Sequence, residues 1–111
     1  LEKLKPLFAH IDANFSRVIT VEQAADLVHM SKSTFMRFFR EVTGQSFVGY
    51  LNRFRIARAE VLLSKTDLPI AEVGLRVGFC DQSYFGLTFR NLLEMTPREY
   101  KNRLKERTRA S

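Results

Sequence analysis

Two segments of the sequence, fifty positions apart, repeat one pattern. Each has a residue that can cap a helix, a phenylalanine four positions on, and a phenylalanine-arginine pair that begins four positions later. The copies are Ser31, Phe35, Phe39-Arg40 and Asp81, Phe85, Phe89-Arg90. A spacing of four puts both phenylalanines of a copy on one face of a helix, whose first turn Ser or Asp can cap. The sequence therefore predicts one capped helix with an aromatic inner face, used twice.

Helix signals cover nearly the whole chain. Apolar residues at helical spacing predict a first helix over about residues 2–14. Thr20 followed by Gln23 has the form of a capping box, which predicts the start of a second helix. Gly44 can adopt the left-handed conformation that closes a helix, so the helix capped by Ser31 should end there. No segment alternates apolar and polar residues, and we expect an all-α fold without a sheet.

A long helix is predicted over residues 46–64, where it would span roughly 26 Å as a rigid spacer. Pro69 suits the first turn of the next helix, and Gly78 interrupts the pattern before Asp81. Thr96-Pro97-Arg98-Glu99 predicts the start of a last helix, with Tyr100 and Leu104 inward and a frayed basic end. We therefore expect a first subdomain over residues 1–45, a linker helix over 46–64 and a second subdomain with a basic tail over 65–111.

The basic charge of the chain is concentrated in one region. The net charge is +6, and residues 31–66 hold seven basic and only two acidic residues. Such a surface attracts phosphates, RNA or acidic lipids alike, so charge does not choose among these partners. No stretch has the roughly 20 apolar residues of a membrane span and no signal peptide is evident, so we expect a soluble chain without a membrane partner.

The residue inventory offers little for catalysis. The single cysteine, Cys80, excludes an internal disulfide and a cysteine-rich metal site, and favours a cytoplasmic location. His10 and His29 fall on separate predicted elements, and glycine-rich phosphate loops are absent. The ten phenylalanines lie at helical spacings typical of a core rather than of stacking platforms for single strands. We expect no enzyme, no metal and no cofactor.

A helix, a tight turn and a capped helix form the helix-turn-helix pattern, whose second helix can enter the DNA major groove. This pattern occurs twice, and each copy should turn its aromatic residues inward and a polar face outward. The expected inner residues are Phe35, Phe38 and Phe39 in the first copy, and Tyr84, Phe85 and Phe89 in the second. The expected outward residues are Lys32, Ser33, Met36 and Arg37 in the first copy, and Gln82, Ser83, Gly86 and Leu87 in the second.

Each outward residue has a role in DNA binding and a plainer alternative. Arg37 can bind guanine or be a solvated charge, and Gln82 can bind adenine or only occupy the first turn of its helix. Lys32 suits a phosphate, whereas Ser33 and Thr34 can bond a phosphate or the helix backbone. The predicted base contacts are Ser33, Met36, Arg37, Gln82, Ser83, Gly86 and Leu87. The predicted phosphate contacts are Lys32, Thr34, Arg40 and Arg90. The alternative for the two arginines is an ion pair with an acidic residue such as Glu41.

Other basic residues are less specific. Arg53, Arg55 and Arg58 lie on the predicted linker helix, where Arg55 and Arg58 share a face and can brace the two subdomains. The tail carries alternating Lys101, Arg103, Lys105, Arg107 and Arg109. A solvated tail or a nonspecific attraction to DNA explains it.

The second half of the chain holds a long series of motifs in a fixed order, and the first copy has its own set. They are Ile70-Ala71-Glu72-Val73-Gly74-Leu75-Arg76-Val77-Gly78-Phe79, Asp81-Gln82-Ser83-Tyr84-Phe85, Phe89-Arg90 and Thr96-Pro97-Arg98-Glu99-Tyr100, and in the first copy Ser31, Phe35, Phe39, Arg40, Gly44 and Ser46. From about Leu4 to Leu104 the chain thereby resembles the AraC/XylS transcription regulators. The resemblance implies seven helices, two helix-turn-helix subdomains joined by a linker helix, and asymmetric sites on double-stranded DNA. It also implies a sensing or dimerising domain outside this stretch, with Leu1 at a cut.

Departures from the family pattern fall at turns and on the second outward face. Phe47 replaces a usual proline, and Glu94 replaces a usual glycine. Leu87 stands where a longer polar or basic residue is common, beside Gly86. Leucine cannot donate to guanine, although it can touch a thymine methyl group. The second copy should read few bases or mainly hold the backbone, so the first should dominate specificity.

The sequence thus favours a DNA-binding domain of a transcription regulator, whose recognition helices enter adjacent segments of the major groove. The alternative is a helical protein-interaction module whose basic face meets an acidic partner such as a subunit of RNA polymerase. Both functions can coexist, because activators often touch polymerase while they are bound to DNA.

Overall fold

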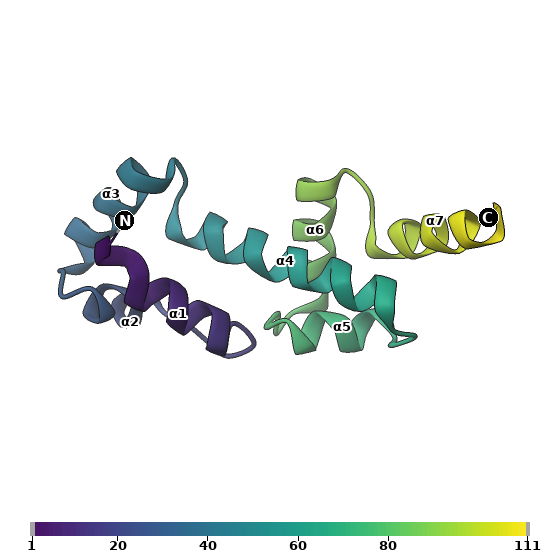
Figure 1. Ribbon diagram of the computed structural model, residues 1–111, viewed down its shortest axis with the longest axis horizontal. Helices are drawn as coiled ribbons and strands as arrows, with labels where there is room; N and C mark the ends of the chain where they lie inside the picture. Colours follow the sequence, from purple (N-terminus) through teal and green to yellow (C-terminus); the bar gives the residue numbers. More distant parts are fainter. Residues whose placement is uncertain (1, 111) are drawn as a thin grey trace. The chain divides into compact units, whose positions relative to one another are not determined.

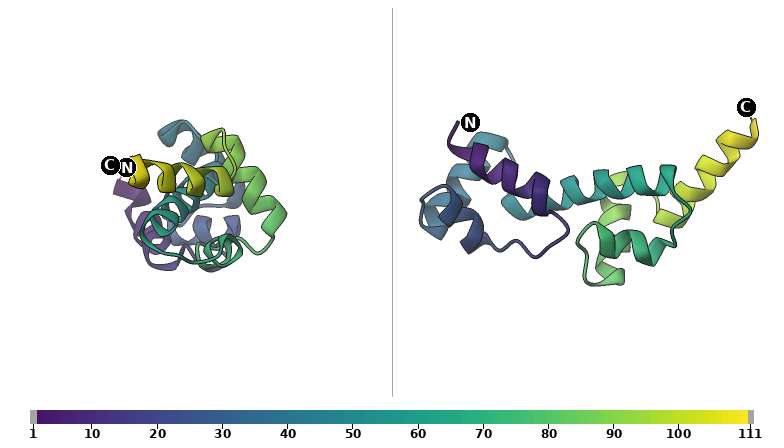
Figure 2. Two further views of the ribbon diagram at one scale, coloured as in Figure 1. Left: turned by 90° about the vertical axis from the view of Figure 1, so that its right-hand side faces the viewer. Right: turned by 60° about the horizontal axis from the view of Figure 1, so that its bottom comes forward.

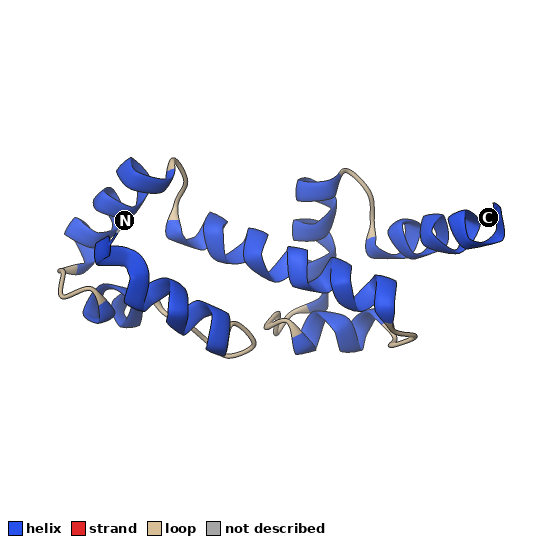
Figure 3. Ribbon diagram, in the orientation of Figure 1, coloured by secondary structure: helices blue, strands red, loops and turns tan. Residues whose placement is uncertain are grey.

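A computed structural model describes residues 2–110, with side chains described for residues 2–107. Every regular element in that range is a helix (Figure 3), as the sequence predicts. A short 3₁₀ turn, η1 (Glu2–Leu4), precedes seven α-helices (Figure 1). These are α1 (Lys5–Asn14), α2 (Val21–Leu27), α3 (Lys32–Thr43), α4 (Phe47–Lys65), α5 (Ile70–Arg76), α6 (Gln82–Leu93) and α7 (Pro97–Ala110).

The chain forms two compact units, and the division between them falls inside α4. The first unit ends at Phe54 and the second begins at Arg55. Leu51, in the N-terminal part of α4, is buried in the first unit. Ile56, Ala59 and Leu63, in its C-terminal part, are buried in the second. The helix predicted as a linker therefore supplies core residues to both units.

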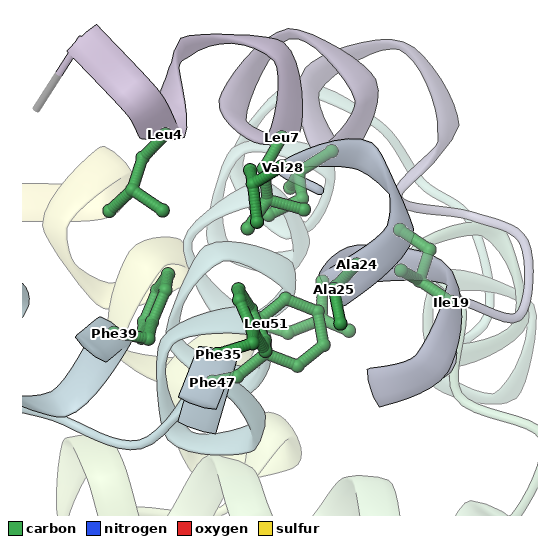
Figure 4. Close-up of a cluster of buried hydrophobic side chains, with 11 residues drawn as sticks. Leu4, Leu7, Ile19, Ala24, Ala25, Val28, Phe35, Phe39, Phe47 and Leu51 are labelled. Carbon is green, nitrogen blue, oxygen red and sulfur yellow. The ribbon is translucent and has the colours of Figure 1, made fainter. Parts of the chain in front are cut away.

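The core of the first unit surrounds the two phenylalanines of the first sequence copy. Phe35 and Phe39 are fully buried on the inner face of α3, among apolar residues of α1, α2 and α4 (Figure 4). The Phe39 ring lies 5.6 Å from the ring of Phe35, 5.7 Å from that of Phe47 and 5.5 Å from that of Tyr50, centroid to centroid. The contacts with Phe47 and Tyr50 are edge-to-face, and such ring contacts add to the stability that burial provides.

The second unit has a smaller aromatic core built around the second copy. Phe85 and Phe89 on α6 are buried, with ring centroids 5.9 Å apart. Phe79 lies 5.2 Å from Phe85, and Tyr100 of α7 lies 5.6 Å from Phe89. In this unit α5 runs beside the C-terminal part of α4, as two views show (Figures 1 and 2). The repeated phenylalanines thus have the same inward role in both units.

The predicted helix starts are confirmed by their hydrogen bonds. The side chains of Ser31 and Asp81 accept bonds from backbone N–H groups three residues on, at 3.3 and 3.1 Å. Thr20 and Gln23 form the reciprocal bonds of a capping box, at 2.9 and 3.0 Å. Thr96 and Glu99 form the same motif at the start of α7. The local pattern of the sequence was sufficient to locate these starts because each bond spans three residues.

The C-terminal ends of α3 and α6 have the same geometry, although Glu94 stands at one of them in place of the family's usual glycine. Gly44 follows the last residue of α3 and Glu94 that of α6, and both have left-handed backbones, at φ of 77° and 60°. Their N–H groups bond the carbonyls of Arg40 and Arg90 at 2.9 and 2.8 Å. The turn at Glu94 thus keeps its geometry without glycine, at an energetic cost. Pro69 differs from its predicted place, because it caps α5 from outside with extended backbone instead of forming the first helical turn.

Candidate nucleic-acid interface

The first helix-turn-helix consists of α2, a tight turn and α3. His29 has a left-handed backbone in this turn, at φ 58°, and the cap at Ser31 lies two positions later. With Phe35 and Phe39 buried, the opposite face of α3 lies in solvent. All six residues predicted to contact DNA on this helix are exposed, namely Lys32, Ser33, Thr34, Met36, Arg37 and Arg40. Ser33, Met36, Arg37 and Arg40 follow the i, i+3, i+4, i+7 spacing of a single helix face and share one outward surface, whereas Lys32 and Thr34 lie on either side of it. Phe38 is half-buried.

Two of these residues already have partners within the unit. Lys32 Nζ lies 3.4 Å from a carboxylate oxygen of Glu22 on α2. A backbone hydrogen bond and the charge of Lys32 both lower the pKa of Glu22. The Ser31 hydroxyl donates to the Thr34 hydroxyl oxygen at 3.0 Å, which leaves the Thr34 proton available to an acceptor. The ion pair between Lys32 and Glu22 is exposed and contributes little to stability, so a DNA phosphate can compete with Glu22 for Lys32.

The second helix-turn-helix consists of α5, a turn through Gly78 and α6. Gln82 and Ser83 are exposed at the start of α6, and Leu87 is exposed one turn later. Gly86 is half-buried, and a Cβ atom built on it would have nothing within 4 Å. Nε2 of Gln82 donates to the carbonyl oxygen of Ala71 on α5 at 3.1 Å. The Gln82 amide therefore tethers α6 to α5, a role that the sequence did not suggest.

One inner residue of the second copy was wrongly predicted. Tyr84 is 45% exposed, although its ring lies 5.9 Å from that of Phe79. The buried residues of α6 are Phe85, Thr88 and Phe89, so Thr88 is an inner residue that the sequence did not suggest. A phenol can border a core and keep its hydroxyl in water, so its aromatic character alone misled the assignment.

Arg40 and Arg90 hold corresponding places in the two units. Each is exposed in the last turn of its helix, directly after a buried phenylalanine. Their side chains are thus positioned to reach an anion on the same side as the outward face. The phosphate role of both arginines stays a prediction.

The three arginines of α4 do not act alike. Arg53 and Arg58 are exposed, whereas Arg55 is half-buried with its guanidinium 6.0 Å from the centre of the Phe79 ring. Burial lowers the pKa of Arg55. A cation over an aromatic face is stabilising, and Arg55 thereby supports the core of the second unit itself. The tail residues from Lys101 to Arg107 belong to α7, while the side chain of Arg109 lies outside the described part.

Two surface residues were missed in the sequence. Val48 at the start of α4 is 54% exposed and, with Met36 and Arg40, lines a hollow beside α3. In the second unit Arg98 and Lys101 line a more polar hollow beside α5. Val48 and Arg98 are themselves fifty positions apart, so the repeat continues past the phenylalanines. Extending the alignment through the caps Ser46 and Thr96 would have found them.

Other kinds of site receive no support from the described residues. In that part of the chain no group of three or more His, Cys, Asp and Glu side chains is placed to hold a metal ion. None of the described helices is long and apolar enough to cross a membrane. The outward faces of α3 and α6 are the candidate sites of the two units, and each belongs to a helix-turn-helix.

Comparisons with known proteins place this fold in a family. A family model described as a helix-turn-helix domain matches residues 24–103. Regulatory protein PocR of Salmonella typhimurium is 33% identical over 104 residues, which cover 94% of this chain and 34% of PocR. Regulatory protein SoxS of Escherichia coli is 31% identical over 101 residues, which cover 91% of this chain and 94% of SoxS. The chain spans about a third of PocR but nearly all of SoxS.

A solved structure agrees with the sequence relatives. The DNA-binding domain of the global transcriptional factor AdpA, in complex with a target DNA, has a TM-score of 0.87 at 28% identity, over 95% of this chain and 94% of that one. An AraC-type regulator from Chromobacterium violaceum has a TM-score of 0.83 at 29% identity, over 93% of this chain and 92% of that one. The chain therefore belongs to the AraC-type family of helix-turn-helix domains of transcription regulators.

Proposed function

We propose that this chain binds double-stranded DNA sequence-specifically, as the DNA-binding part of a transcription regulator. The observation that carries the proposal is the outward face of α3, where the exposed residues Ser33, Met36, Arg37 and Arg40 share one surface while two buried phenylalanines anchor the opposite face. A helix held rigidly in this way can present side chains to the major groove at fixed positions. The AdpA domain, which has the same fold, was solved on its target DNA.

The two recognition helices divide the work in this proposal. Arg37 binds guanine through its planar fork of donors, with Ser33 and Met36 beside it. On α6, Ser83, Gly86 and Leu87 face the bases, and Gln82 keeps one donor for its bond to Ala71 and offers the rest of its amide to adenine. The helices enter adjacent segments of the major groove, and the first unit supplies most of the specificity.

The phosphate contacts set the affinity. Lys32 and Thr34 hold the DNA backbone at the start of α3, and Arg40 and Arg90 hold it at the ends of α3 and α6. The net charge of +6 strengthens this attraction over the whole chain.

We further propose that the protein acts in the cytoplasm, without a catalytic role, and that a sensing or dimerising domain accompanies it in a longer protein.

Selection from random duplex DNA at moderate salt tests the proposal. We expect a few rounds with this chain to enrich one motif, asymmetric because the outward faces of α3 and α6 differ. Recovery of unselected sequence would exclude sequence-specific binding. The enriched motif then supplies the DNA for measurements on the variants described below.

The alternative function is a protein-interaction module, and it has its own observation. The exposed basic side chain of Arg53 lies on α4, outside the recognition helices, where it can meet an acidic partner such as a subunit of RNA polymerase. Reporter activation tests this role in cells. A variant that binds the selected DNA normally but no longer activates would assign a partner to this surface.

A further inference from the structure

Leu87 has an unusual place for an apolar side chain. It is 57% exposed on the outward face of α6, six positions after the cap at Asp81. Arg37 stands six positions after the cap at Ser31, so the two residues correspond in the fifty-residue repeat. The same position therefore carries a guanidinium in one unit and a bare isobutyl group in the other.

The surroundings of Leu87 leave room for a base edge. A Cβ atom at neighbouring Gly86 would have nothing within 4 Å, and glycine itself adds no side chain there. Ser83, one turn earlier, is small and exposed. The helix backbone can therefore approach the floor of a groove more closely here than at Met36 and Arg37, which fill the matching positions of α3.

The 5-methyl group of a pyrimidine is the major-groove feature that best complements such a residue. Leucine has no hydrogen-bond donor or acceptor for the polar base edges, whereas the 5-methyl group of a pyrimidine is apolar and points into the groove. Packing these groups together removes both from water. In unmodified DNA that methyl group belongs to thymine.

We propose that Leu87 is a specificity-determining residue that recognises a pyrimidine 5-methyl group, that of thymine, in the DNA segment read by α6. This inference rests on the proposed function and goes further, since it names a base for the second unit. The first unit then selects guanine through Arg37 and the second thymine through Leu87.

A uracil scan isolates the methyl group. Each thymine of the selected motif is replaced in turn by deoxyuridine, which lacks the 5-methyl group and keeps the hydrogen-bonding edge, and the Kd is measured for each duplex. For the native chain we expect one position at which uracil weakens binding about three- to fourfold, the effect of one buried methyl group. For Leu87→Ala the same replacement should have little effect, because the two changes remove the same contact.

A matched control and a second arm separate the sources of the effect. Leu75 is similarly exposed, at 54%, but lies on α5, so Leu75→Ala should keep the full uracil effect. Cytosine and 5-methylcytosine are then compared at the sensitive position. We expect methylation to strengthen binding of the native chain by a similar factor and to leave Leu87→Ala unchanged.

The outcomes bear on the two proposals separately. A motif without a Leu87-dependent uracil effect, or an equal effect in native chain and Leu87→Ala, would overturn the thymine assignment and leave DNA binding standing. Failure to select any motif would overturn both. Circular dichroism melting of Leu87→Ala confirms that an altered fold does not cause the change, because the side chain is mostly in solvent.

Discussion

The helices α3 and α6 are alike on the inside and different on the outside. Both begin with a side-chain cap, bury two phenylalanines four apart and end on a left-handed residue. Their outward faces share little, because Met36 and Arg37 correspond to Gly86 and Leu87. The inner face sustains a scaffold twice, and the outer face is free to bind two different DNA segments.

The largest effect should come from removing a repeated phenylalanine. Both Phe39 and Phe89 are fully buried, so their replacement by alanine should cost about 3–5 kcal/mol of unfolding free energy. Phe39 contacts the larger aromatic cluster, and Phe39→Ala should therefore cost more than Phe89→Ala. Urea unfolding monitored by circular dichroism measures both. A greater loss of unfolding free energy in Phe89→Ala would show that the number of aromatic contacts does not set the cost of removing a core phenylalanine.

The first helices of the two helix-turn-helix motifs, α2 and α5, differ at one buried position, where α5 has a glycine. Ala24 on α2 is fully buried, and the corresponding residue on α5 is Gly74. A Cβ at Gly74 would lie 2.7 Å from Cδ2 of Phe85 and 3.1 Å from Nε2 of Gln82. Because Phe85 is buried and cannot move easily, Gly74→Ala should cost about 1–3 kcal/mol despite the better helix propensity of alanine.

The control for Gly74→Ala lies on the neighbouring helix. Gly86 is also helical but has open space where a Cβ would be, so Gly86→Ala should raise stability by about 0.5–1 kcal/mol. Thermal melting of the two variants gives opposite signs if close packing is the cause. Two stabilised variants would show that Phe85 yields to the added methyl group.

The difference between the outward faces of α3 and α6 can be tested by replacing Arg37. Its replacement by alanine should weaken binding to the selected motif by about 1–3 kcal/mol and relax the preference at one base pair. Binding of a panel of single-base variants of the motif measures both. An equal loss on every sequence would make Arg37 a phosphate contact, and α3 would then lose its place as the main specificity helix.

The ends of the two helices differ in a way that stability can measure. Glu94 adopts the left-handed conformation that Gly44 provides at the end of α3. Glu94→Gly should stabilise the chain by about 0.5–1 kcal/mol, and Gly44→Ala should destabilise it by about 1 kcal/mol. Thermal melting checks the pair. A loss of stability in Glu94→Gly would mean that the glutamate side chain contributes more than its backbone costs.

The smallest effect is expected at Arg90. If it contacts one phosphate, Arg90→Ala should weaken binding on all sequences alike and reduce the slope of log K against log salt by about one. Arg40→Ala, at the corresponding place, serves as its counterpart. A slope that stays unchanged in either variant would reject the phosphate role of that arginine.

Much of this protein could be predicted from the sequence because its signals are local. Caps at Ser31, Asp81 and Thr96 act over three residues, and phenylalanines four apart must share a helical face. The all-α fold, the helix starts and the exposure of Arg37 and Leu87 follow from such short-range rules. The base and phosphate roles of these side chains depend on the DNA and stay predictions.

The remaining features depended on residues that meet only in the folded chain. Arg55 stacks on Phe79 and Gln82 bonds to Ala71, contacts that span 24 and 11 positions of the chain and leave no periodic trace in the sequence. The sequence also predicted Tyr84 as an inner residue, but the side chain is partly exposed. Sequence periodicity thus determined which residues form helices and which faces turn inward. Tertiary packing decided which polar residues became internal supports, because a neighbour from another helix sets the space and the hydrogen-bond partner that each side chain meets.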